Sequence, residues 1–498
     1  MIRDKQLKDI VDLSGVSFGT SGARGLVTDM TDEVCYAYSA AFLQTVSSEA
    51  KKVVVGHDLR PSSPRITAAC AAAISAFGRQ IVYVGELPTP AIAFYATQVG
   101  VPAIVVTGSH IPFDRNGIKF YRVDGEISKA DEQAMMGALV DLPGVLEPAT
   151  LPLPDRHAAD AYIKRYLDFF ATDALKGFRV AVYEHSSVAR DLLRSILEGL
   201  GASVISLGRT DTFVPIDTEA VRPEDVAQAR QWAEEYDFDA IISTDGDADR
   251  PLIGDERGEW LRGDVVGILC AQYLQADVVV TPVSCNTALE KCGSFKRVIR
   301  TRIGSPYVIA EMEISQQDGN DVVIGYEANG GFLLGSAVLR DGRCLAALPT
   351  RDAVLPILAL LVMSREKECM LSHLAQELPA RYTASDRVQK IGAEASLSLI
   401  DSLLKSAELM KQVMGRQCGE IALIDQTDGL RVTFGSGEIV HLRPSGNAPE
   451  LRCYTEADTA DRAGSLCRDC LSHVLEMVDN CNLTTKPYTN CHSCNQSR

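Results

Sequence analysis

The chain has 498 residues, 46% of them hydrophobic and 23% charged, so it is long enough for about three or four domains with separate cores. Its formal net charge of −17 argues against binding to nucleic acid or anionic lipid, since both partners require clustered lysine and arginine. The longest apolar run, residues 353–363, is too short to span a bilayer, so no membrane association is expected.

The N-terminal residues carry scattered charges and lack the apolar segment of a secretory signal. The 14 cysteines stand mostly alone in apolar contexts, which is typical of reduced thiols. We therefore expect a cytoplasmic protein. Residues 16–27 form a glycine-rich loop in which Arg24, between small residues, could reach a phosphate.

Three later stretches, residues 51–85, 178–208 and 277–304, repeat one plan. Each has a β-branched run, a polar loop, a helical pattern and a second apolar run that ends at glycine. Since parallel strands need a crossover helix between them, this plan predicts three α/β units with parallel or mixed sheets. One larger doubly wound domain is the competing interpretation, and the chain length favours separate units.

Within the first unit, residues 102–121 place Ser109 directly after a buried strand, in a loop with His110 and Pro112. Ligands of open α/β sheets bind at this carboxyl edge, so we expect the hydroxyl to be exposed there. A serine that carries a phosphoryl group needs a metal or nearby cations, and Lys119 could supply one. The alternative is a turn of serine, histidine and proline that has no catalytic role.

A linker rich in proline, residues 142–157, leaves the first unit, and a helix over 158–170 opens the second. The second unit then delivers Asp245, Asp247 and Asp249 from an apolar strand, at alternate positions that put three carboxylates on one side. Hard oxygen ligands of this kind suit Mg²⁺. A calcium loop of the EF-hand type fits less well, because Arg250 stands where that loop needs glycine and a strand precedes it where a helix is required.

In the third unit, residues 321–336 end a β-branched run in a loop with Glu327, Asn329 and Gly330. A carboxylate beside an amide can contact neighbouring sugar hydroxyls, because one accepts and the other donates hydrogen bonds. The more frequent explanation of such a pattern is a turn that needs positive φ at Gly330 and Gly331.

After residue 376 the pattern changes to short strands joined by glycine turns and a closing helix over 458–478, which predicts a fourth, α+β unit. Its loop around residues 440–454 combines an arginine with hydroxyl, amide and glycine, the components of a phosphate-binding loop, although a hairpin turn with an exposed arginine is the alternative. The expected boundaries are 1–150, 151–260, 261–370 and 371–480, followed by a disordered tail, 481–498. The tail contains a C-x-x-C pair, Cys491 and Cys494, but no second ligand pair at zinc-finger spacing.

Taken in this order, the loops TGSHIP, DGDADR, EANGG and RPSGNAPE resemble those of the α-D-phosphohexomutase superfamily, over about residues 18–454. The resemblance implies four domains around a central cleft, three related mixed-sheet α/β domains and a C-terminal domain similar to the TATA-binding protein. It implies an isomerase of the phosphomannomutase/phosphoglucomutase type that converts hexose 1-phosphate to hexose 6-phosphate through phosphoserine and a 1,6-bisphosphate. The protein would need Mg²⁺ and act as a monomer or homodimer.

The resemblance also implies roles for single residues. Lys119 would carry a proton, since a lysine among other cations can have its pKa lowered toward neutrality. The implied catalytic residues are Ser109, Lys119, Arg24, His110 and Arg250, the metal ligands are Ser109, Asp245, Asp247 and Asp249, and the substrate-binding residues are Glu327, Asn329, Gly330, Arg443, Ser445, Gly446 and Asn447.

The sequence departs from the family's pattern after Glu327, where relatives often carry Ser-Gly-His and this chain has no histidine. Ser305 similarly stands where some relatives have histidine. These two departures do not identify the sugar. Among the substrates that the resemblance implies, we expect mannose phosphate to lead, with glucose phosphate second and glucosamine phosphate as the alternative. Two rivals of other classes are a serine-dependent metal phosphatase, for which the eight histidines lack ligand spacing, and a calcium-binding module.

Overall fold

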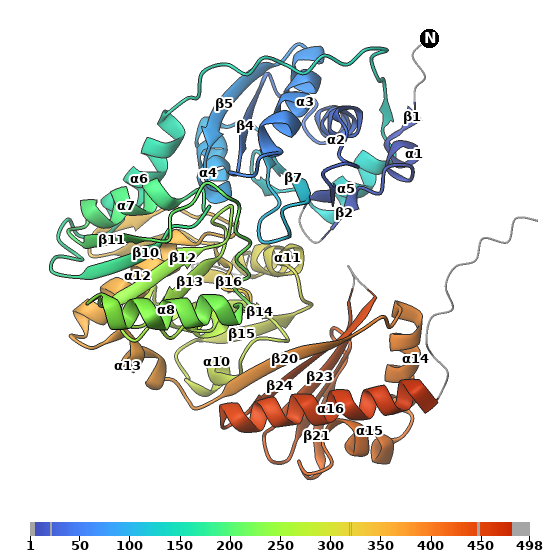
Figure 1. Cartoon of the computed structure of the whole chain (residues 1–498), viewed down its shortest axis with the longest axis vertical. Coiled ribbons are helices and arrows are strands. Elements are labelled where there is room, and N and C mark those ends of the chain that lie inside the picture. Colours follow the sequence, from blue (N-terminus) through green and yellow to red (C-terminus); the bar gives the residue numbers. More distant parts are fainter. Residues whose placement is uncertain (1–4, 20–21, 318, 320, 446–448, 481–498) are drawn as a thin grey trace, which may run out of the picture. The chain divides into compact units, whose positions relative to one another are not determined.

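A computed structural model describes residues 5–19, 22–317, 319, 321–445 and 449–480 (Figure 1). The chain forms two compact units. The first consists of residues 1–285 and 289–378, and the second of residues 286–288 and 379–498. The three predicted α/β regions lie in the first unit except for residues 286–288, and the predicted α+β region lies in the second unit from residue 379 onward.

The first sheet of unit one is mixed and has the strand order β2-β3-β7-β6-β4-β5. Strand β4 (Lys52–His57) pairs in parallel with β5 (Gln80–Glu86) and β6 (Ala103–Val106), whereas β7 (Arg115–Arg122) runs antiparallel to β6. Every residue of β6 is buried, as its run of β-branched residues predicts. The other elements here are β1 (Lys5–Gln6), α1 (Leu7–Val11), β2 (Ser17–Phe18), β3 (Ala23–Leu26), α2 (Asp32–Thr45), α3 (Ser63–Ala76), α4 (Thr89–Val99), β8 (Gly125–Glu126), α5 (Lys129–Met136) and β9 (Leu139–Val140).

The second sheet has the order β11-β10-β12-β13. Strands β10 (Arg179–Tyr183) and β11 (Ser203–Leu207) are parallel, β12 (Ala240–Thr244) is parallel to β10, and β13 (Pro251–Gly254) is antiparallel to β12. The helix predicted to open this region is α6, one residue earlier at each end than expected. The helices of this region are α6 (His157–Phe169), α7 (Arg190–Gly199) and α8 (Pro223–Glu235).

The third sheet repeats that plan with the order β15-β14-β16-β17. Strands β14 (Val278–Pro282), β15 (Arg297–Thr301) and β16 (Val323–Tyr326) are parallel, and β17 (Phe332–Leu334) is antiparallel to β16. The predicted mixed α/β architecture is thereby confirmed. The remaining elements are α9 (Gly263–Tyr273), α10 (Ala288–Lys291), α11 (Ser305–Gln316), β18 (Val338–Arg340), β19 (Arg343–Leu345), α12 (Val354–Glu366) and α13 (Leu371–Gln376).

The longest apolar run of the sequence forms α12, which is buried along most of its length. Among the helices within the described ranges, none is both long and apolar enough to cross a bilayer.

The second unit is an antiparallel sheet with helices, so the predicted α+β character is confirmed. Its strand order is β20-β24-β23-β22-β21, and α16 lies across the sheet (Figure 1). Apolar side chains of the sheet and of the helices packed against it form a separate hydrophobic core for the second unit. The elements are β20 (Tyr382–Gln389), α14 (Ala393–Leu404), α15 (Ala407–Met414), β21 (Ile421–Asp425), β22 (Leu430–Phe434), β23 (Ile439–Pro444), β24 (Glu450–Ala457) and α16 (Ala460–Asn480).

Candidate active site

The three predicted catalytic and binding loops of unit one occupy equivalent places in its three larger sheets. Each connects a buried strand to the antiparallel strand beside it: β6 to β7, β12 to β13, and β16 to β17. Asp245 and Glu327 directly follow their strands, and Ser109 lies three residues after β6. The repeated strand plan therefore carries one chemical loop in each repeat.

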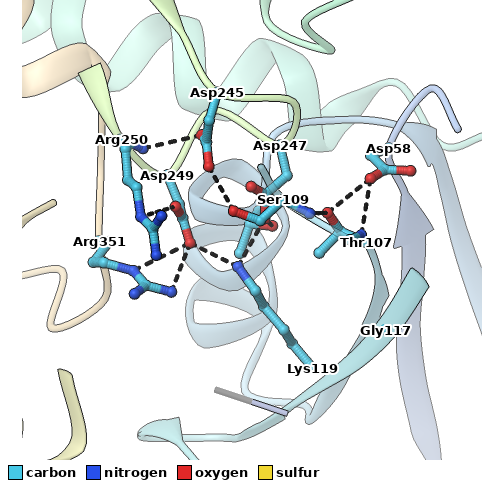
Figure 2. A network of polar contacts seen from close by, with 12 residues as sticks. Asp58, Thr107, Ser109, Gly117, Lys119, Asp245, Asp247, Asp249, Arg250 and Arg351 are labelled. Atoms are coloured by element: carbon cyan, nitrogen blue, oxygen red, sulfur yellow. Dashed lines mark hydrogen bonds and ion pairs between the residues drawn. The ribbon is translucent and has the colours of Figure 1, made fainter. Parts of the chain in front are cut away.

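Ser109 lies at the centre of the site, and its side chain is fully buried. The expected exposure of its hydroxyl was wrong, because the aspartate loop packs against the serine loop and covers it. Its backbone has a φ of 51°, a left-handed conformation that non-glycine residues rarely adopt. The backbone N–H donates to Thr107 Oγ1 at 2.8 Å, and Oγ donates to Asp245 Oδ2 at 2.6 Å. The serine loop and the aspartate loop thus meet at this hydroxyl (Figure 2).

The three aspartates each present a carboxylate oxygen within 4.8 Å of the others, and all three are buried. Burial and the charges of Asp247 and Asp249 raise the pKa of Asp245 well above its ordinary value. Oδ1 of Asp247 and Oδ1 of Asp249 are buried without a hydrogen-bond partner. Unpartnered buried carboxylate oxygens are costly, so this donor set fits a metal ion that would bind them.

Lys119 extends from β7 to the same aspartates (Figure 2). Its Nζ lies 2.7 Å from Asp247 Oδ2 and 2.6 Å from Asp249 Oδ2, and the side chain is buried. Burial alone lowers the pKa of Lys119, but the two carboxylates outweigh it and hold the pKa above its ordinary value. The expectation that neighbouring cations lower this pKa is therefore wrong for this arrangement, because carboxylates are its nearest charges.

His110 and Arg250 form a second contact between the two loops. Arg250 Nη1 lies 2.7 Å from His110 Nδ1, and because arginine can only donate, the histidine proton is assigned to Nε2. Burial, followed by the charge of Arg250, lowers the pKa of His110 to about 2, so the ring is neutral. Arg250 is also held by its backbone N–H, which donates to Asp245 Oδ1 at 3.3 Å.

Arg24 lies on β3, opposite Gly117 of β7. Burial, and then the charges of Arg250 and Arg351, lower the pKa of Arg24 to about 10, which places it among the cations of the site. The N-terminal arginine singled out in the sequence is thus part of this cluster.

Arg351, just before α12, is a site residue that the sequence reasoning missed. Its Nη2 lies 2.8 Å from Asp249 Oδ2, and its Nη1 donates to Glu327 Oε2 at 3.4 Å, so it joins the aspartate loop to the glutamate loop. Burial opposes ionisation of Asp249, but Arg351, Lys119 and Arg250 hold the pKa of this carboxyl well below its usual range. The only signal in the sequence was an Arg-Asp pair at the start of a strongly apolar segment.

The glutamate loop is a tight turn in which the Gly330 N–H donates to the Glu327 carbonyl at 3.0 Å. Gly330 has a φ of 86°, but Gly331 does not have positive φ, so the turn interpretation was wrong for that glycine. A Cβ at position 331 would lie 2.5 Å from Arg351 Cδ, so this glycine allows close packing instead. Asn329 Oδ1 accepts from the Gly331 N–H at 2.9 Å.

The predicted phosphate loop belongs to the second unit. It joins β23 to β24, which pair as an antiparallel hairpin. Arg443 Nε donates to Asp428 Oδ2 at 2.8 Å, and the Ser445 N–H donates to the Glu450 carbonyl at 2.8 Å. Gly446 and Asn447, and the predicted tail 481–498, lie outside the described residues.

Comparisons with known proteins agree with the fold. Models of the phosphoglucomutase/phosphomannomutase alpha/beta/alpha domains I, II and III match residues 15–140, 160–258 and 262–382, and the model of the C-terminal domain matches residues 377–472. The chain belongs to the phosphoglucomutase/phosphomannomutase family. It is therefore an isomerase of the phosphohexomutase type, which acts on hexose phosphates, and this assignment favours the mutase over the phosphatase and the calcium-binding module.

Two relatives match nearly end to end. A phosphomannomutase of Salmonella muenchen is 50% identical over 469 residues, which cover 94% of this chain and 97% of the relative. A phosphomannomutase of Sinorhizobium fredii strain NGR234 is 44% identical over 462 residues, 91% and 97% of the two chains. A family protein of Burkholderia thailandensis has the same fold, with a TM-score of 0.73, 20% identity, and coverage of 96% and 98%.

Proposed function

We propose that this phosphohexomutase interconverts mannose 1-phosphate and mannose 6-phosphate, with glucose phosphates as a second substrate pair, and that Ser109 carries the phosphoryl group. The observation that carries the proposal is the 2.6 Å contact between Ser109 Oγ and Asp245, beside buried carboxylate oxygens of Asp247 and Asp249 that lack a hydrogen-bond partner. The choice of mannose rests on the two phosphomannomutase relatives. Glucosamine phosphate is the alternative substrate.

We propose that the metal is magnesium, bound by the three aspartates and by the phosphorylated Ser109. A divalent ion is supported because a phosphoserine would add a charge of about −1.5 to −2 to a site where three aspartates lie together and where basic groups already pair with the acidic ones. When bound, magnesium would neutralise the oxygens of the transferring phosphoryl group. The acidic groups are Asp245, Asp247, Asp249 and Glu327, and the basic groups are Arg24, Lys119, Arg250 and Arg351.

In the proposed reaction, a free hydroxyl of the hexose monophosphate attacks the phosphorus of phosphoserine 109. The Oγ–P bond breaks as the new O–P bond forms. Lys119 accepts the proton of the attacking hydroxyl and gives it to the departing Ser109 Oγ, which is left as a neutral hydroxyl, while Arg250 and Arg24 stabilise the phosphoryl charge. A cation bound to the aspartates would neutralise the carboxylates that raise the pKa of Lys119. That pKa would then fall toward neutrality, where a lysine can exchange a proton. The bisphosphate then turns, and Ser109 Oγ attacks its other phosphate. The Ser109 proton passes through Lys119 to the sugar oxygen that leaves, which restores the phosphoserine and releases the product with a free hydroxyl.

We further propose that Glu327, Asn329 and Gly330 contact sugar hydroxyls, and that the loop with Arg443 and Ser445, together with Gly446 and Asn447 outside the described residues, holds the distal phosphate. A fork-shaped arginine matches phosphate oxygens, which supports the last assignment. The domain boundaries 1–150, 151–260, 261–370 and 371–480, a cytoplasmic location and a monomer or homodimer complete the proposal.

The experiment is a side-by-side assay of mannose, glucose and glucosamine 1-phosphates with a trace of the matching 1,6-bisphosphate. We expect conversion to the 6-phosphates without release of inorganic phosphate, with the highest kcat/KM for mannose 1-phosphate. Preference for glucosamine 1-phosphate would replace the proposed substrate, and release of phosphate at the rate of sugar consumption would replace the proposed reaction.

Replacing Asp247 by asparagine is expected to weaken Mg²⁺ binding at least about tenfold, because one charged oxygen ligand becomes a neutral amide. Calorimetric titration of metal-free protein with MgCl2 measures this directly. Asp255→Asn is the matched control: Asp255 is equally buried and close in the chain, but it pairs with Arg257. Equal affinities of the two variants would remove Asp247 from the proposed ligand set.

A further inference from the structure

Arg60 lies in the loop after β4 and is almost fully buried, at 1% exposure. Its side chain contacts the backbone of the loop that carries Ser109. Nη1 donates to the carbonyl oxygens of Pro112 at 2.7 Å and Arg115 at 2.9 Å. Nη2 donates to the carbonyl oxygens of Ser109 at 3.0 Å and of Ile111. One guanidinium group therefore binds four carbonyls that would otherwise need other partners in the interior.

Asp58 holds the other side of the same loop (Figure 2). Its Oδ2 accepts from Thr107 Oγ1 at 2.8 Å and from the Gly108 N–H at 3.2 Å, and it lies 3.4 Å from Arg60 Nε. Because Thr107 Oγ1 in turn accepts from the Ser109 N–H, a continuous chain of hydrogen bonds connects Asp58 to the backbone of the serine.

The guanidinium of Arg60 is closely packed on two sides. The ring of Phe213 covers the guanidinium, with Cζ 4.0 Å from the ring centroid. On the loop side, a Cβ at Gly108 would lie 2.4 Å from Cζ, so only glycine permits this approach. The loop and the arginine are therefore in direct contact along the backbone.

We infer that Arg60, with Asp58, is a positioning residue that holds Ser109 in its left-handed conformation, with Oγ directed at Asp245. Because Arg60 is almost fully buried, its role is through the loop carbonyls and Asp58 rather than through contact with substrate. A displaced loop would align the phosphoryl group less well and admit water to it, so loss of Arg60 should slow transfer and speed hydrolysis of phosphoserine. The inference rests on the proposed role of Ser109.

The test is Arg60→Lys, which keeps the buried charge but cannot reproduce the fork that reaches four carbonyls. We expect kcat to fall about 10- to 100-fold with KM within about twofold of wild type. We also expect phosphate to be lost from the purified phosphoprotein several times faster, measured over time by intact mass. Arg165→Lys is the matched control: Arg165 is also buried, donates to the Ala346 carbonyl and lies over the Phe94 ring at 4.9 Å.

A second variant, Thr107→Val, removes the hydroxyl between Asp58 and the Ser109 N–H without removing a charge, and it should show the same pattern in kcat and phosphate loss. Wild-type kcat and phosphate retention in folded Arg60→Lys would overturn the inference. If Arg60→Lys fails to fold, wild-type kcat and phosphate retention in Thr107→Val would overturn it instead. Effects of Arg60→Lys no larger than those of the control Arg165→Lys would also overturn the inference. Failure of the proposed function would look different, because wild-type protein would then carry no phosphate on Ser109.

Discussion

Replacing Ser109 by alanine is expected to lower mutase turnover by at least about three orders of magnitude, because alanine has no oxygen to carry the phosphoryl group in the proposed reaction. The structure gives this serine a buried position 2.6 Å from Asp245. A coupled assay of hexose 1-phosphate conversion measures the loss. Intact mass should find one phosphate on part of the native protein and none on the variant.

Ser39→Ala is the matched control for this experiment. Ser39 is equally buried, on α2, where its hydroxyl donates to the Cys35 carbonyl at 2.9 Å, away from the aspartates. The control should keep both turnover and phosphate. If Ser109→Ala protein turned over at a rate near that of the control, the phosphoserine mechanism would be wrong.

Replacing Lys119 by methionine is expected to lower kcat by about 10² to 10⁴, the usual contribution of a general acid or base, with a smaller effect on KM. Stability should fall as well, by about 3–5 kcal/mol, because Asp247 and Asp249 would lose their shared buried cation. Steady-state kinetics and denaturant unfolding measure the two effects separately. Added Mg²⁺ should restore part of the stability but not the rate, since the ion cannot carry the proton.

Lys164→Met is the control, because Lys164 forms an exposed pair with Asp168 at 2.8 Å, of a kind that contributes about 0–1 kcal/mol. A Lys119→Met protein with near-normal kcat would remove Lys119 as the proton carrier. Loss of stability without loss of rate would leave it as a charge partner of the aspartates only.

Those parts of the fold that depend on local sequence patterns could be predicted. Runs of β-branched residues followed by helical patterns predicted the parallel pairs β4 with β5, β10 with β11, and β14 with β15, and all three form. The fourth, α+β unit was also predicted correctly. Glycine turns were read less reliably, as Gly331 shows, because close packing against a distant side chain can require glycine as much as positive φ does.

The sequence alone determined which residue types stand at the ends of the buried strands: a serine, three aspartates and a glutamate. Only the tertiary structure decided that Ser109 meets Asp245 from 136 residues away, that carboxylates surround Lys119, and that Arg60 and Arg351 bind these loops from outside them. The physical reason is that periodicity reports which face of an element is buried. The partner of a buried charge depends on how whole sheets pack, and no local pattern records that.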